Sequence, residues 1–90
     1  MGNFYHVFIE PKEGVTPQQV EDKMNLAVDW FRCTRNVWVL YTTSDHDKWQ
    51  ERLRPLVDPK GSLFICRLDV NERNGWMIRT FWDWLNKPRS

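Results

Sequence analysis

The sequence lacks a long hydrophobic run and has almost no net charge. It has no stretch of 18 apolar residues and no basic-plus-apolar leader, so we expect a cytoplasmic chain that makes no contact with a membrane. Its 13 basic and 12 acidic side chains give a formal net charge of +1, which excludes the strong overall field of a highly basic nucleic-acid-binding domain. Any nucleic-acid contact therefore needs a local basic patch.

Residues that commonly carry chemistry are also scarce. The two cysteines, Cys33 and Cys66, lie in apolar strand-like runs, where we expect buried thiols and not a disulfide framework. His6 and His46 share no motif with each other or with the cysteines, which disfavours a zinc site. A nucleophile elbow, a phosphate-binding glycine loop and a dinucleotide fingerprint are missing as well. We therefore expect no cofactor and no common catalytic motif.

Apolar and aromatic side chains are abundant. Of the 90 residues, 41% are hydrophobic and six are tryptophan, enough for one small domain that covers residues 1–90 with a tail from residue 71 onward. Alternating, helical and turn-like patterns predict strands at 4–10, 30–34, 36–43 and 62–70, and helices at 16–28, 44–57 and 78–85. The richest segment runs from Trp30 to Asp45, with Trp38 placed in the core.

Capping residues support both main helices. Thr16, Pro17 and Gln19 form a capping box with proline at the first helical position. Ser44 is expected to cap the second helix with Asp47 at its third position, while a proline at position 55 is expected to kink or shorten the last turn. The buried stripe of this helix is expected to be Trp49, Leu53, Leu56 and Val57.

The order strand–helix–strand–strand–helix–strand predicts an α+β, ferredoxin-like βαββαβ fold. This topology has a four-stranded antiparallel sheet with two helices on one face. The first and third strands are central, and the other two are edges. Cys33 and Cys66 are then on opposite edges, too far apart for a disulfide.

One stretch of the sequence also resembles a known family. The segments RNVWVLYTTSD (35–45), WQERLRPLV (49–57), SLFI (62–65), GW (75–76) and WL (84–85) resemble the SinR-like small proteins, which are relatives of the CRISPR spacer-acquisition scaffold and endoribonuclease family and of VapD-like toxin ribonucleases. The resemblance spans residues 30–85. It implies a homodimer connected with nucleic acid, as either a metal-dependent nuclease or a scaffold on duplex DNA.

Glu10 is the candidate catalytic and metal-binding residue. In the CRISPR-associated relatives an aspartate ends the first strand, and two such residues approach across the dimer with a divalent metal. The matching position here is Glu10, followed by Pro11 where the family has an apolar residue. The resemblance implies Mg²⁺ or Mn²⁺ if the chain is a nuclease. The alternative is an ion pair, because the fold places Arg35 beside the end of the first strand.

A second candidate is the strand face that carries Phe4, His6 and Phe8, with Arg67 expected opposite on the last strand. Its aromatic rings can stack on bases while the arginine binds phosphate, as in RNA-recognition modules. Alternatively, the C-terminal tail or a second copy of the chain buries this face. We favour burial, because the basic-glycine-aromatic signature of such modules is absent.

Basic side chains outside the charge-balanced surface of the second helix are a third candidate, for nucleic-acid binding. This group consists of Arg32, Arg35, Arg73, Arg79, Lys87 and Arg89, with Arg67 added from the sheet face. The sequence as a whole favours a homodimeric, non-catalytic protein associated with nucleic acid. Two alternatives stay open: a metal-dependent nuclease that uses Glu10 at a dimer interface, and a protein-interaction or accessory module.

Overall fold

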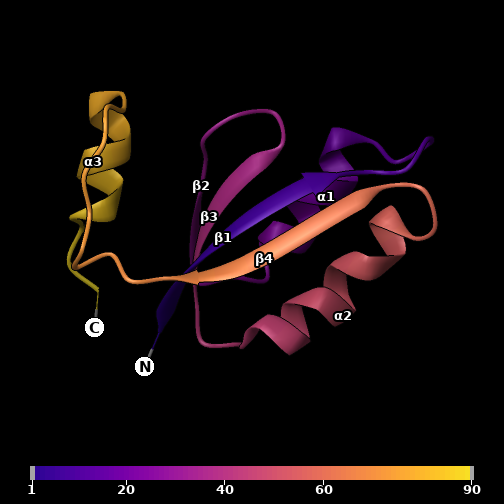
Figure 1. The fold of residues 1–90 in the computed structure, drawn as a ribbon, viewed down its shortest axis with the longest axis horizontal. Helices are drawn as coiled ribbons and strands as arrows, with labels where there is room; N and C mark the ends of the chain where they lie inside the picture. Colours follow the sequence, from indigo (N-terminus) through magenta and orange to yellow (C-terminus); the bar gives the residue numbers. More distant parts are fainter. Residues whose placement is uncertain (1, 90) are drawn as a thin grey trace.

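A four-stranded antiparallel sheet forms the centre of the computed structural model, which describes residues 2–89 (Figure 1). The elements are β1 (Asn3–Glu10), α1 (Pro17–Met24), β2 (Asp29–Arg32), β3 (Val37–Thr42), α2 (His46–Val57), β4 (Ser62–Leu68) and α3 (Arg79–Leu85). The strand order is β2-β3-β1-β4. The predicted α+β fold, with β1 and β3 central and β2 and β4 at the edges, is confirmed.

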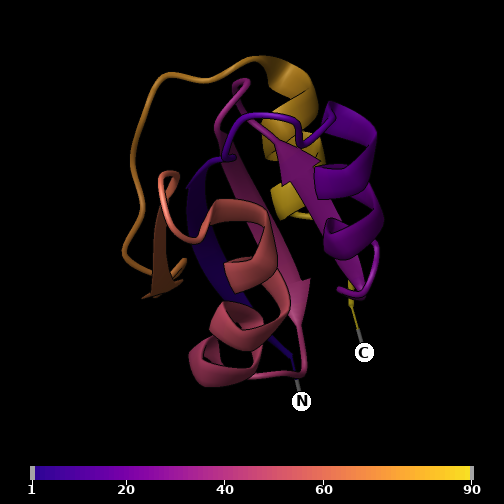
Figure 2. The same ribbon diagram turned by 90° about the vertical axis from the view of Figure 1, so that its right-hand side faces the viewer.

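Strand β1 divides its side chains between the two faces of the sheet. Tyr5, Val7 and Ile9 are buried on the side of α1 and α2, where they join the core. Phe4, His6 and Phe8 alternate with them and lie on the other side. Figure 2 shows α1 and α2 on one side of the sheet and α3 on the other. Both faces of the central strand are therefore at least partly covered.

The predicted start of α1 is confirmed. The Gln19 backbone N–H donates to Thr16 Oγ1 at 3.2 Å, and the Thr16 backbone N–H donates to Gln19 Oε1 at 2.8 Å. The helix ends at Met24, earlier than the expected residue 28. Asn25 caps its end, and the Asn25 side chain accepts a hydrogen bond from the Trp30 indole at 2.8 Å. This contact draws the chain directly into β2.

The expected N-cap of α2 was wrong, and the last turn is not shortened at Pro55. Asp45 is the N-cap, since its carboxylate accepts from the Lys48 N–H at 2.9 Å, whereas the Ser44 N–H donates to Thr42 Oγ1. The helix also continues through Pro55 to its end at residue 57. Because Pro55 lies in the last turn, its missing N–H removes only one bond near the helix end. The predicted buried stripe of this helix is confirmed.

Tryptophans fill the space between the sheet and its two main helices. Trp38 and Trp49 are almost fully buried, at 1% and 0% exposure. The Trp49 indole N–H donates to the buried Thr42 hydroxyl at 3.0 Å, which satisfies both polar groups. Trp30 meets Trp38 edge-on, with 4.8 Å between ring centroids. Trp38 thus lies in the core, as predicted.

The two thiols differ in environment. Cys33 follows β2 and is half-buried, so burial raises its pKa, whereas Cys66 is exposed on β4. Both are free, and they lie at opposite edges of the sheet as predicted. The expected burial of Cys66 was wrong, because no helix covers its side of β4. Within residues 2–89, no helix is long and apolar enough to cross a membrane.

Candidate interaction surface

The face of the sheet opposite α1 and α2, here called the open face, carries most of the aromatic residues outside the core. Cross-strand partners share a face, so the register places Leu68, Cys66 and Phe64 of β4 beside Phe4, His6 and Phe8 of β1. On the other flank of β1, the same face carries Tyr41, Val39 and Val37 of β3. The open face is thus continuous across the sheet.

Helix α3 covers the β2–β3 half of the open face. The Trp84 ring centroid lies 5.9 Å from that of Phe4 and 5.8 Å from that of Phe31, and Phe81 lies 5.3 Å from Phe31. Beneath the helix, Val39 is buried. The tail therefore packs on its own chain, which is one of the two alternatives proposed for this face.

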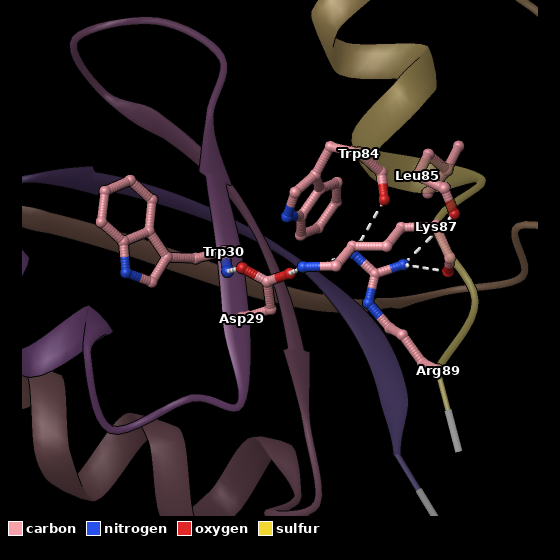
Figure 3. Close-up of polar contacts among 6 residues, drawn as sticks. All are labelled: Asp29, Trp30, Trp84, Leu85, Lys87 and Arg89. Atoms are coloured by element: carbon pink, nitrogen blue, oxygen red, sulfur yellow. Dashed lines mark hydrogen bonds and ion pairs between the residues drawn. The ribbon is translucent and has the colours of Figure 1, made fainter.

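Arg89 fastens the end of the tail to the sheet (Figure 3). One of its terminal nitrogens, Nη2, donates to the Trp84 carbonyl at 2.8 Å and to Asp29 Oδ2 at 3.2 Å. Its guanidinium lies 4.6 Å from the Trp84 ring centroid and 5.2 Å from that of Tyr41. The side chain is only 10% exposed. Arg89 thus caps α3 and joins it to β2 and β3.

Asp29, at the start of β2, is the acidic partner of Arg89. The contacts of Arg89 with Asp29 and with α3 are here called the clamp. Lys87 also approaches the Asp29 carboxylate, at 3.6 Å. Burial alone raises the pKa of Asp29, but the Trp84 indole, the Trp30 N–H, Arg89 and the charge of Lys87 outweigh burial and hold the pKa below its ordinary value. The expectation that Lys87 and Arg89 are uncompensated basic residues was wrong. Sequence reasoning missed Asp29, since 60 positions separate it from Arg89.

The β1–β4 half of the open face, here called the uncovered half, is not covered by any helix of the described residues 2–89. Phe64 is 60% exposed, and its ring lies 6.4 Å from that of His6. Phe8, directly across from Phe64, is half-buried. The segment that leads from β4 to α3 carries further exposed apolar residues, among them Trp76, which is 99% exposed, and Ile78. Exposed apolar groups are therefore concentrated on and after β4.

Arg67 is not on the open face, where it was expected. The register pairs Arg67 with Tyr5, whose side chain is on the side of α1 and α2. Because neighbouring residues of a strand point to opposite faces, this difference of one position removes the arginine from the aromatic surface. The uncovered half thus consists of aromatic and thiol side chains with no guanidinium from β4.

Glu10, Arg32 and Arg35 share a cavity of about 380 Å³ at the other end of β1. Arg32 is held by the β2–β3 turn, since its Nη2 donates to the Arg35 carbonyl at 2.9 Å and its guanidinium lies 5.2 Å from the Trp38 ring. The predicted proximity of Glu10 and Arg35 is confirmed. The expected ion pair between them is not formed. Among residues 2–89, neither side chain takes part in a salt bridge within 4.0 Å.

The donors around Glu10 do not fit a divalent metal within one chain. In the described part of the chain, no group of three or more histidine, cysteine, aspartate or glutamate side chains is close enough to hold an ion. The groups that share the cavity with Glu10 include two guanidiniums, whose positive charge opposes a bound cation. A metal at Glu10 would therefore require ligands from another molecule.

The remaining arginines differ in their partners. Arg79 lies 4.0 Å from Asp83 on the highly exposed side of α3, and Arg73 donates to the Asn86 side chain. In residues 2–89, Arg32, Arg35, Arg67 and Arg73 make no salt bridge within 4.0 Å. These four side chains are the available cations from the predicted nucleic-acid-binding set.

Comparison of the chain with protein-family models, with curated proteins and with solved structures gave no match.

Proposed function

We propose that this chain is a homodimeric, non-catalytic binding protein that associates with nucleic acid. The observation that carries the proposal is the uncovered half of the open face. Phe64 is 60% exposed there, beside Phe8 and His6, while α3 covers the rest of the same face. Exposed apolar patches of this kind mark interaction sites on small soluble domains.

A second copy is the partner that best matches this surface. Burial of a phenylalanine gains about 1.5–3 kcal/mol, and a two-fold dimer buries each such residue twice. Direct base stacking on the same surface is less well supported, because stacking modules place a cation beside the rings to meet phosphate. Here Arg67 lies on the opposite face.

Support for nucleic-acid association comes from Arg32, Arg35, Arg67 and Arg73, which have no carboxylate partner within the described residues. Guanidinium groups bind phosphate in a bidentate manner. Since one chain carries a net charge of only +1, a dimer that doubles these positions supplies more cationic contacts than a monomer.

The dimer is tested by light scattering coupled to size exclusion. Wild type is expected to run as a dimer, and Phe64→Glu as a monomer with an unchanged circular-dichroism spectrum. Val28→Glu is the matched control, because Val28 is also an exposed apolar residue, at 65%, but lies outside the sheet. A wild-type protein that stays monomeric at high micromolar concentration refutes the dimer.

Nucleic-acid association is tested by fluorescence anisotropy with labelled duplex and single-stranded probes over a salt series. The binding constant is expected to fall steeply as the salt concentration rises. In the double variant Arg35→Ala/Arg67→Ala, the slope of log binding constant against log salt concentration is expected to be smaller by about one for each phosphate that is no longer bound. Arg79→Ala is the control, since Arg79 is already paired with Asp83. Absence of binding at low salt to every probe favours the accessory-module alternative.

The nuclease alternative has a separate test. Probe cleavage in Mg²⁺ or Mn²⁺ that disappears in Glu10→Ala, while probe binding is kept, would assign catalysis to Glu10. We expect no such cleavage, because Arg32 and Arg35 share the cavity with this carboxylate.

A further inference from the structure

Among residues 2–89, no strand pairs with the outer edge of strand β4. It is the terminal strand in the order β2-β3-β1-β4, and it runs for seven residues from Ser62 to Leu68. Natural edge strands are usually protected by lysine, by proline or by short length. Within β4 the sequence SLFICRL contains neither lysine nor proline, and its single charge lies near one end. The edge therefore offers a row of main-chain donors and acceptors flanked by apolar side chains.

We propose that two copies of the chain pair antiparallel along their β4 edges and join their sheets into one. This inference rests on the proposed homodimer and specifies how that dimer forms. Pairing by a two-fold axis satisfies the outward N–H and C=O groups of both edges at once. Full overlap of residues 62–68 puts Ile65 of each copy on the axis.

This register sets which side chains meet. Phe64 of one copy lies directly across from Cys66 of the second copy, and both are on the open face. The two uncovered halves then become continuous across the axis. Phe64, exposed in one chain, acquires a neighbour from the other chain without any movement of α3.

A groove alongside the edge gives the second copy space. Its volume is about 330 Å³, between α2 and β4, and its lining includes Val57, Leu63 and Ile65 together with the polar His46 and Arg54. On an added strand, Leu63 and Ile65 of the second copy point to the same side of the sheet as this groove. Their apolar side chains therefore fill a hollow that one chain leaves open.

Cysteine cross-linking tests the register. On a Cys33→Ser background, Phe64→Cys is expected to form a covalent dimer under mild oxidation, with a peptide map that links position 64 to Cys66 of the other chain. Directly opposed residues in antiparallel strands have the Cβ spacing that a disulfide needs. Adding Cys66→Ser is expected to abolish that linkage, and Cys33→Ser alone is expected to give no such dimer.

A dimer that forms no cross-link between positions 64 and 66 overturns edge pairing and leaves the proposed homodimer intact. A strictly monomeric wild type overturns both.

Discussion

Replacing Arg89 with alanine is expected to release α3 from the sheet. The side chain is 10% exposed and donates to Asp29, so the variant loses a charge-assisted hydrogen bond worth about 1.5–3 kcal/mol. It also loses the cation–π interactions with the rings of Trp84, Tyr41 and Phe4, which contribute about 0.5–1 kcal/mol. The docking of α3 should therefore weaken by about 2–4 kcal/mol, or some 30- to 1,000-fold in its opening equilibrium.

Hydrogen exchange measures this effect locally. In Arg89→Ala the amide of Asn86, bonded to the Trp82 carbonyl at 2.9 Å, should exchange much faster, while amides in the β1–β3 ladder change less. Arg79→Ala is the matched control, because Arg79 is an arginine of the same helix but is 93% exposed. Its exposed pair with Asp83 contributes less than about 1 kcal/mol. Equal exchange in the two variants would refute the clamp.

The clamp also predicts a pH dependence. The folded pKa of Asp29 is lowered, so its contribution to docking is present at neutral pH and is lost as the pH falls through that folded value. Fluorescence from the tryptophans of α3 should therefore change in the acid range. Asp29→Asn should remove this transition, whereas Asp83→Asn should keep it. An acid transition of the same size in Asp29→Asn would contradict the assignment.

Three further predictions concern the core, the thiols and a tight turn. Trp38→Ala is expected to cost about 3–5 kcal/mol in urea denaturation, whereas Trp76→Ala, at a 99% exposed residue, should change little. Cys66 should react with a thiol reagent faster than Cys33, whose half-burial raises its pKa; the reverse order would contradict the exposure described. Gly61→Ala should lower stability by about 1–3 kcal/mol, since its Cβ would contact main chain at the end of β1; unchanged thermal unfolding would refute this.

Much of the fold could be predicted from the sequence because local signals agreed. The Thr16–Gln19 capping box and Pro17 start α1 where the sequence indicates. Alternation along residues 4–10 predicts β1 and its two covered faces. These features depend on residues within a few positions of one another, so no tertiary information is required.

Other features depend on choices that local patterns leave open. Ser44 and Asp45 are both good N-cap residues, and the local pattern does not choose between them; in the structure the Asp45 carboxylate accepts from the Lys48 N–H. Both faces of β4 carry apolar side chains, so alternation does not determine which side Arg67 takes. Only the pairing with β1 fixes that choice.

The covered part of the candidate surface was the hardest to predict. The tail was identified as one cover for the open face, but its attachment depends on Arg89 and Asp29, which lie at opposite ends of a long stretch of chain. Their contact becomes visible only when β2 and α3 are placed together. The sequence therefore predicted an aromatic face and its cover, but not the ion pair that fixes the cover.

The position of β1 between β3 and β4 has a consequence for biosynthesis. Both of its partner strands follow it in the chain, and the first of them ends at Thr42. While the ribosome is making these residues, Phe4, Val7 and Ile9 have no sheet to join. The apolar side chains of β1 therefore stay exposed until β3 has left the exit tunnel. A chaperone that binds extended apolar peptides is expected to bind this segment before the sheet forms.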